Sequence, residues 1–239
     1  MLNKTFIRFR AKASRIINNP RDPVKDMARL LKPHQVKGII DAGAYHGEMS
    51  RRFKTAFPFA SIYAFEPYPE TFALLEENVH DLSNVRIFNL AISSHTGTSN
   101  FYINFRSYTN SLLPRSKWGE IYHFEQTTPV GSCEVRLVTL DDWREQFDIE
   151  DGIDIVKLDI QGGELEALRG APDLLSSTVK LVYSEIQFVP LYEGACLYFE
   201  LASFLEKIDF HLYQFYDLKS APDGRLIYGD ALFARSYVL

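Results

Sequence analysis

Two segments far apart in the chain each run from apolar residues to an acid and then into glycines. The first, Ile39–Gly47, reads Ile-Ile-Asp-Ala-Gly-Ala-Tyr-His-Gly, and the second, Ile155–Glu164, reads Ile-Val-Lys-Leu-Asp-Ile-Gln-Gly-Gly-Glu. A buried parallel strand that ends in this way delivers a polar side chain to the ligand-binding edge of an α/β sheet. We therefore expect Asp41 and Asp159 at that edge, beside a nucleotide-like cofactor.

The glycines of the first segment, Gly43 and Gly47, allow a tight turn and close approach of backbone to a ligand. Their G-x-x-x-G spacing differs from the G-x-G-x-x-G of dinucleotide-binding turns. An acid directly before them suits a cationic or hydroxyl-bearing ligand better than a pyrophosphate. We predict a cofactor-binding turn that includes Tyr45 and His46, with His46 lining the turn rather than acting as a base. A purely structural turn is the alternative.

Glu66 ends a third apolar run, and Pro67 follows it and stops the strand. A carboxylate has two acceptor oxygens and no competing donor, so Glu66 could accept both hydroxyls of a ribose. The next strand end, Asn89-Leu-Ala91-Ile-Ser, could lie along an adenine, with Asn89 or nearby backbone as its hydrogen-bond partner. A solvated acid and an ordinary strand end are the alternatives for these two segments.

Asp159 and Glu185 end neighbouring predicted strands, and either could be a general base or orient the acceptor. Asp159 is also a candidate cofactor contact. Lys157 alternates with Asp159 on the same strand face, so it could pair with an acid there and hold it ionised. A structural ion pair is the alternative for Lys157. Carboxylates suit hard cations, but we see no dedicated ligand set and predict no metal site.

An irregular segment, residues 105–129, is rich in Ser, Thr, Tyr, Pro and Trp and has no clear period. A stretch of this length inside a compact domain is usually a functional loop. Aromatic faces with hydroxyl and amide groups indicate a wall for a polyhydroxylated or mixed-polarity acceptor, and they could equally plug the sheet edge. The candidate acceptor-binding residues are Tyr108, Asn110, Ser111, Trp118 and His123.

These residues must be positioned by alternating strands and helices with short connections. The expected strands are Val36–Asp41, Ser61–Glu66, Val85–Ala91, Thr98–Asn104, Glu134–Leu140, Asp154–Asp159 and Val179–Ile186, and the expected helices are Gly47–Phe57, Glu70–Val79, Gly163–Arg169 and Cys196–Ile208. Two last strands, Phe210–Tyr216 and Leu226–Ala234, are joined by a turn at Pro222-Asp-Gly. This hairpin requires at least one antiparallel strand.

Composition narrows the class of protein. The 239 residues carry a net charge of −5, but residues 1–21 hold six Lys or Arg and no acid, which leaves −11 for the remainder. The main body therefore lacks the clustered cations that nucleic-acid binding needs. No apolar run reaches the ~18 residues of a membrane span, and we see no secretory signal. The two widely spaced cysteines fit reduced thiols and a cytoplasmic protein.

Residues 2–17 are expected to form an amphipathic helix with a basic stripe. It could contact a membrane surface or a partner, or pack on its own domain. A short helix is expected to follow, to about Leu31, before Pro33. We therefore divide the chain into a helical extension, residues 1–33, and an α/β domain, residues 34–239, with an acceptor-side insertion at about residues 98–140.

Four motifs together resemble the FkbM family of S-adenosylmethionine-dependent methyltransferases, in order, from about Gly38 to Phe233. They are Asp-x-Gly-x-x-x-Gly at Asp41, Tyr-Ala-Phe-Glu-Pro ending at Pro67, Asn-Leu-Ala-Ile-Ser from Asn89, and Lys-x-Asp-x-x-Gly-x-Glu-x-x-x-Leu-x-Gly from Lys157. The last motif is the most specific. The family usually has Glu-Gly-Ala where this chain has Gln161-Gly-Gly.

The resemblance implies a class I methyltransferase fold, which is α/β and Rossmann-like, with a doubly wound, mostly parallel seven-stranded sheet and a C-terminal antiparallel hairpin. It implies S-adenosylmethionine as cofactor, with Asp41 and the glycine turn at the methionine moiety and sugar edge, and Glu66 at the ribose. Characterised members methylate hydroxyl oxygens of sugars, polyketides and similar small molecules. The acceptor here is expected to be a small molecule or carbohydrate.

Two other classes of function remain open from the sequence. A nicotinamide oxidoreductase would fit Glu66, but the glycine spacing and the terminal hairpin argue against it. A non-catalytic module of the same fold could bind a partner or membrane through its N-terminal helix. The presence of Asp41, Glu66 and Asp159 argues against that module. The sequence does not predict an oligomeric state.

Overall fold

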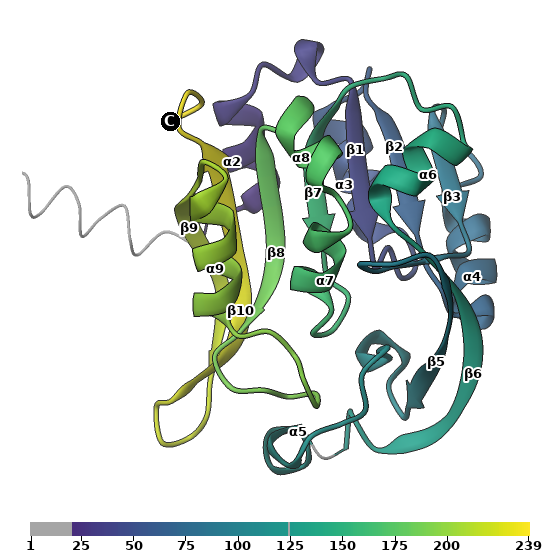
Figure 1. Cartoon of the computed structure of the whole chain (residues 1–239), viewed down its shortest axis with the longest axis vertical. Coiled ribbons are helices and arrows are strands. Elements are labelled where there is room, and N and C mark those ends of the chain that lie inside the picture. The colour runs from purple at the N-terminus through teal and green to yellow at the C-terminus, as the bar shows by residue number, and fades with distance from the viewer. Residues whose placement is uncertain (1–20, 124) are drawn as a thin grey trace, which may run out of the picture.

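The computed structural model describes residues 21–123 and 125–239 and is built around one twisted seven-stranded sheet (Figure 1). The strand order is β3-β2-β1-β7-β8-β10-β9, in which β10 runs antiparallel to both of its neighbours and the other pairings are parallel. The predicted doubly wound fold with a terminal hairpin is confirmed. The strands are β1 (Gly38–Ala42), β2 (Ser61–Phe65), β3 (Val85–Phe88), β7 (Ile153–Leu158), β8 (Leu181–Gln187), β9 (Phe210–Ser220) and β10 (Leu226–Arg235).

Helices cover both faces of this sheet (Figure 1). One face carries α2 (Pro23–Leu30), α3 (Glu48–Ala56) and α4 (Pro69–Val79), and the other carries α6 (Leu140–Gln146), α7 (Glu164–Arg169), α8 (Pro172–Ser177) and α9 (Tyr198–Lys207). All residues of β1 and β7 are buried, as expected for central parallel strands with helices on both sides. The apolar runs of the sequence therefore become the middle of the sheet.

A second, three-stranded sheet projects beyond the C-terminal ends of the main strands (Figure 1). It contains β4 (Ala91–Ile92), β5 (Gly97–Asn104) and β6 (Pro129–Val138), and between β5 and β6 lie a 3-10 turn, η2 (Ser107–Thr109), and a short helix, α5 (Lys117–Tyr122). The arm includes most of the segment predicted as an insertion, about residues 98–140. It faces the edge at which β1 and β7 end.

Several predicted elements need correction. The strand expected over Val85–Ala91 is two strands in different sheets, because the Asn89 side chain donates hydrogen bonds to the backbone oxygens of Glu66 and Pro67 and turns the chain. The segment expected to be irregular contains α5, whose first turn donates to Ser116 Oγ. Helices α6 and α8 were not predicted. Both are short and are set by local start signals, a Thr139 cap and a first-turn Pro172.

The predicted short helix before the α/β domain is present as α2, and it packs on the core. Asp22 caps it, and Val24 and Met27 are buried against the sheet. Asp26 is buried and accepts a hydrogen bond from Tyr216 of β9 at 2.8 Å. The helix predicted for residues 2–17 lies outside the described residues. A 3-10 turn, η1 (Pro33–Gln35), leads into β1.

Bilayer-spanning helices are absent from the described part of the chain, where each helix is too short or too polar to cross a membrane.

The turn after β1 depends on a glycine. Gly43 has φ +72, and a Cβ at this position would lie 1.8 Å from the carbonyl oxygen of Asp159. Its own N–H and that of Ala44 donate to the carbonyl oxygen of Phe65 at 3.0 and 2.9 Å. The turn thus connects the ends of β1, β2 and β7, and a side chain cannot be placed there without moving one of them.

Replacement of Gly43 by alanine is expected to destabilise the protein more than the same change at Gly224. Both residues have positive φ, but nothing lies within 4 Å of a Cβ at Gly224. Gly224→Ala should cost the left-handed strain alone, about 1–2 kcal/mol. Gly43→Ala should cost about 1–3 kcal/mol more, because of the clash. Urea unfolding of both variants measures the difference, and equal midpoints would contradict the proposed contact.

Candidate active site

A cavity of about 220 Å³ lies at the C-terminal ends of β1, β2 and β7. The strand ends and the turn after β1 form one side, and the β5–β6 arm forms the other. Its polar and backbone lining includes Gly43, Tyr45, Glu66, Ser107, Tyr108, Asn110, Lys157, Asp159 and Gln161, and its apolar lining includes Met49, Phe65, Pro67, Leu90, Ala91, Ile92, Phe101, Leu112 and Ile160. The sequence motifs therefore converge on one cavity.

Tyr45 connects the glycine turn to the arm. Its backbone is left-handed, with φ +51, and its hydroxyl lies 3.2 Å from Ser107 Oγ. Its ring stacks on His46 at 3.7 Å between centroids. Neither His46 nor Gly47 lines the cavity, and Gly47, at φ +90, is the N-cap of α3. The turn thus brings backbone and the Tyr45 ring to the cavity.

Glu66 stands directly after β2 with its carboxylate in the cavity wall. The N–H of Tyr45 donates to Oε2 at 3.2 Å, and the N–H of Tyr68 donates to Oε1 at 3.0 Å. Burial raises the pKa of Glu66 to about 7, against the lowering effect of these two donors. Each oxygen keeps a lone pair for a further donor, so this carboxylate can accept two hydroxyl groups.

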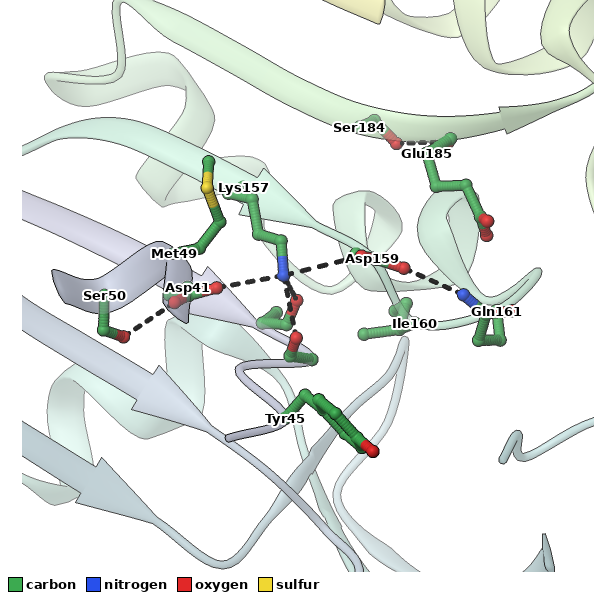
Figure 2. Close-up of polar contacts among 12 residues, drawn as sticks. Asp41, Tyr45, Met49, Ser50, Lys157, Asp159, Ile160, Gln161, Ser184 and Glu185 are labelled. Atoms are coloured by element: carbon green, nitrogen blue, oxygen red, sulfur yellow. Dashed lines mark hydrogen bonds and ion pairs between the residues drawn. The ribbon is translucent and has the colours of Figure 1, made fainter. Parts of the chain in front are cut away.

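A buried ion pair joins Lys157, which lines the cavity, to Asp41, which does not (Figure 2). Lys157 Nζ is 3.0 Å from Asp41 Oδ1, and it donates to the backbone oxygens of Ala42 and Gly43 at 3.2 and 2.8 Å. Asp41 is fully buried, and its other oxygen accepts from Ser50 Oγ at 2.7 Å. Burial lowers the pKa of Lys157, but Asp41 and Asp159 outweigh it and the net pKa is raised. Lys157 therefore keeps its charge inside the protein.

Asp159 follows β7 and reaches into the cavity, with about 45% of its side chain exposed. Gln161 Nε2 donates to its Oδ1 at 2.8 Å, and Lys157 Nζ lies 3.9 Å from its Oδ2 (Figure 2). Gln161 has positive φ, +58, and its Oε1 accepts from the hydroxyl of Tyr192 at 2.8 Å. Asp159 is thus a carboxylate held in place but open to a ligand.

Several candidates lie away from this cavity. Asp41 lies behind it, and Asn89 uses its amide on the Glu66 and Pro67 backbone. Ser111 is fully buried and donates to the carbonyl oxygen of Gln161 at 2.7 Å, so it ties the arm to the turn after β7. Trp118 stacks on Tyr122 and lines neither this cavity nor the one described next.

A second, smaller cavity of about 80 Å³ adjoins the first and shares Tyr108 and Gln161 with it. It contains two further candidates, His123 and Glu185. Burial lowers the pKa of His123, whose ring meets the edge of Tyr228 at 5.1 Å. The structure thus separates the predicted residues into two adjoining groups.

Sequence reasoning missed Gln161 as a link between the cavities, along with Tyr192 and Tyr228. In the sequence, the local signal for Gln161 is a polar residue directly before two glycines. The structure shows that this residue has positive φ. Tyr192 and Tyr228 come from a loop and from β10, and no local pattern connects them to the motifs. Within residues 21–123 and 125–239, no three His, Cys, Asp or Glu side chains are grouped as metal ligands.

Comparison with known proteins gives consistent results. The Methyltransferase FkbM domain matches residues 41–213. A 2-O-methyltransferase NoeI of Sinorhizobium fredii (strain NBRC 101917 / NGR234) is 31% identical over 170 residues, which cover 69% of this chain and 68% of that protein. A methyltransferase sdnD of Sordaria araneosa is 30% identical over 159 residues, covering 56% of this chain and 60% of that protein.

Among solved structures, the methyltransferase FkbM of Methylobacillus flagellatus KT aligns with a TM-score of 0.51 at 16% identity. The alignment covers 83% of this chain but only 43% of that protein. The chain therefore spans less than half the length of this solved relative. The likeness supports the class I methyltransferase fold.

Loss of the buried cation is expected to destabilise the fold strongly. Lys157→Met leaves Asp41 buried and uncompensated, and should lower the free energy of unfolding by about 3–5 kcal/mol. Adding Asp41→Asn should recover part of this loss. Arg169→Met, which removes an exposed pair with Glu166, should cost no more than about 1 kcal/mol. Urea unfolding compares the three, and similar midpoints for Lys157→Met and Arg169→Met would contradict the role given to the pair.

Proposed function

The chain belongs to the FkbM family of methyltransferases, and from its site we propose that it transfers the methyl group of S-adenosylmethionine to a hydroxyl oxygen of a small molecule or sugar. The observation that carries this proposal is the convergence of Glu66 and Asp159 on one cavity. One carboxylate is held by two backbone donors at the end of β2, as for a ribose, and the other is open at the end of β7.

The cavity residues fit the cofactor. Glu66 has lone pairs for the two ribose hydroxyls. Gly43 presents backbone without a side chain, as a close ligand approach requires. Asn110 lines the cavity, and its buried Nδ2 has no hydrogen-bond partner among the described residues, so it is a candidate donor for an acceptor atom of the cofactor.

S-adenosylmethionine supplies an electrophilic methyl group, so the protein needs chiefly to align the acceptor and remove its proton. In the transfer, the bond from sulfur to methyl carbon breaks and the bond from acceptor oxygen to that carbon forms. We assign the hydroxyl proton to Asp159. Gln161 and Lys157 fix its orientation.

Lys157 has a positioning role in this proposal rather than a catalytic one. Two backbone carbonyl oxygens and the Asp41 carboxylate already surround its ammonium group. It therefore holds the glycine turn and Asp41 in place. A hydroxyl acceptor is supported by the similarity to a protein named as a 2-O-methyltransferase and by the aromatic and hydroxyl side chains of the arm.

Affinity for the cofactor is expected to increase with pH. The pKa of Glu66 is about 7, and only the ionised form accepts from both ribose hydroxyls. The part of the affinity that depends on Glu66 should strengthen by about tenfold from pH 6 to pH 8. Calorimetric titration with S-adenosylmethionine and S-adenosylhomocysteine measures this, with NAD as a ligand that should not bind.

Glu66→Gln should bind both compounds more weakly and lose this part of the pH dependence. Glu76→Gln, an exposed acid on α4, should behave as the unaltered protein. Failure of both compounds to bind the unaltered protein would refute the proposed function and favour a non-catalytic module. Binding of NAD instead would favour an oxidoreductase.

Asp159→Asn is expected to separate chemistry from binding. The amide keeps the size of the side chain but cannot take a proton, so kcat should fall by about 10²–10⁴-fold. The Kd for S-adenosylhomocysteine should change by less than about threefold, because Asp159 lies at the acceptor side of the cavity. Formation of S-adenosylhomocysteine with a panel of hydroxylated acceptors provides the readout. A variant with full activity would remove Asp159 as the base.

A further inference from the structure

The second cavity is formed where the arm meets β8 and β10. Its lining comprises Tyr108, Thr109, His123, Thr127, Gln161, Glu185, Leu191, Tyr192 and Tyr228. Because it shares Tyr108 and Gln161 with the first cavity, a ligand in it would reach the carboxylate that Gln161 holds, Asp159.

We propose that the second cavity is the acceptor subsite and that Glu185 binds an acceptor hydroxyl there as a hydrogen-bond donor. The inference rests on the proposed function and adds to it the place of the acceptor and the role of this residue. Glu185 is then a substrate-binding residue, distinct from the base Asp159.

The hydrogen bonds of this region leave one carboxyl oxygen of Glu185 without a partner. The Tyr192 hydroxyl shares its proton between two acceptors, Gln161 Oε1 and the backbone oxygen of Thr109. The Thr127 hydroxyl donates to the backbone oxygen of His123. Glu185 Oε2 is closed to solvent and has no hydrogen-bond partner among the described residues. A buried polar atom in this state is costly, and an acceptor hydroxyl would satisfy it.

The strand register explains why Glu185 would donate rather than accept a proton. Glu185 lies directly opposite Asp230 of β10, and Leu158 pairs with Ser184, which places Asp159 beside Glu185. Three carboxyl groups thus stand in a row on neighbouring strands, and Glu164 of α7 adds a fourth. The cation of the site, Lys157, lies nearest to Asp41. Carboxylates on neighbouring strands repel one another, so these carboxyl groups oppose each other's ionisation.

These neighbouring carboxyl groups favour the protonated form of Glu185. Burial, together with Asp159, Glu164 and Asp230, raises the pKa of Glu185 well above its ordinary value, against the lowering effect of Gln161. Burial lowers the pKa of His123. Both shifts favour the uncharged form of the group, and burial likewise favours the protonated form of Tyr192 and Tyr228, whose pKa values it raises.

An uncharged, hydroxyl-rich cavity selects an uncharged acceptor. Neighbouring strands lie about 4.8 Å apart, so Asp159 and Glu185 can contact two adjacent hydroxyls of one ring. One hydroxyl gives its proton to Asp159 as its oxygen is methylated, and the neighbouring one accepts from Glu185. We therefore infer that the acceptor is a neutral ring with two neighbouring hydroxyl groups, with Tyr108 and Tyr228 beside its faces.

The test uses two substitutions with different outcomes. Glu185→Gln keeps a neutral donor of the same shape, whereas Glu185→Leu removes all hydrogen bonding. Glu120→Gln, an exposed acid on α5 of the same arm, is the matched control. Methyl α-mannopyranoside serves as the ring with adjacent hydroxyls, and cyclohexanol as the ring with one. Both are titrated by NMR into protein saturated with S-adenosylhomocysteine.

We expect the sugar to bind the unaltered protein more tightly than cyclohexanol does. Its Kd should weaken at least tenfold in Glu185→Leu and less than threefold in Glu185→Gln and in the control. The Kd for S-adenosylhomocysteine should be unchanged throughout. The infrared difference between the unaltered protein and Glu185→Gln should show a protonated carboxyl group at neutral pH, independently of any acceptor.

Other results overturn the inference. Sugar binding that is absent from the unaltered protein, or unchanged in Glu185→Leu, excludes Glu185 as an acceptor contact. Equal loss in Glu185→Gln and Glu185→Leu, or an ionised carboxylate in the infrared spectrum, excludes the donor role. Failure of S-adenosylhomocysteine to bind the unaltered protein refutes the proposed function itself, and is seen before any sugar is added.

Discussion

The site depends most on the contacts of one buried group, the ammonium of Lys157. It joins the two central strands, because Asp41 of β1 and Lys157 of β7 are register partners in a fully buried part of the sheet. It also binds the carbonyl oxygen of Gly43, so the turn that faces the cavity is held by the same cation. An ion buried here is stable only because each of its protons has an acceptor. The position of the turn that faces the cavity is thus a consequence of charge balance inside the sheet.

The arm turns this sheet edge into an enclosed site. A parallel sheet alone offers an open crevice at its C-terminal ends. Here Ser111 donates to the backbone of Gln161, and Tyr192 donates to the Gln161 side chain, so the arm and the loop after β8 are fastened to the turn after β7. Gln161 consequently lies between the two cavities. Its amide distinguishes this chain from the usual family motif, and it donates to Asp159 where a carboxylate would repel it.

Sequence patterns predicted what local chemistry determines. The apolar runs predicted the parallel strands, Pro222-Asp-Gly predicted the terminal hairpin, and the alternation of Lys157 with Asp159 predicted an ion pair at the end of β7. They could not predict that Asp41 is the nearer partner, because this depends on the register between strands far apart in sequence.

The arm was the least predictable part for a related reason. Its residues are placed by single contacts with distant segments. The Ser116 hydroxyl donates to the backbone of Pro190, which helps to set where α5 begins and leaves Trp118 outside both cavities. The wall of the second cavity combines the arm with Glu185 and Tyr228 from β8 and β10. No periodicity or motif carries that information, since it arises only when the chain has folded.

The surplus of acids at this edge is itself consistent with a cationic ligand. Burial raises the pKa values of Glu66, Glu164 and Asp230 to about 7, and the neighbouring carboxylates Asp41 and Asp159 add to this effect. One lysine cannot offset so many negative charges, so the folded protein must hold some of these groups protonated. The sulfonium of S-adenosylmethionine brings a positive charge to the same edge. A cation there favours ionisation of the carboxyl groups near it, and a neutral thioether does not. Under the proposed function, the acidic edge would favour the methyl donor over its product, because transfer of the methyl group removes the positive charge of the sulfonium.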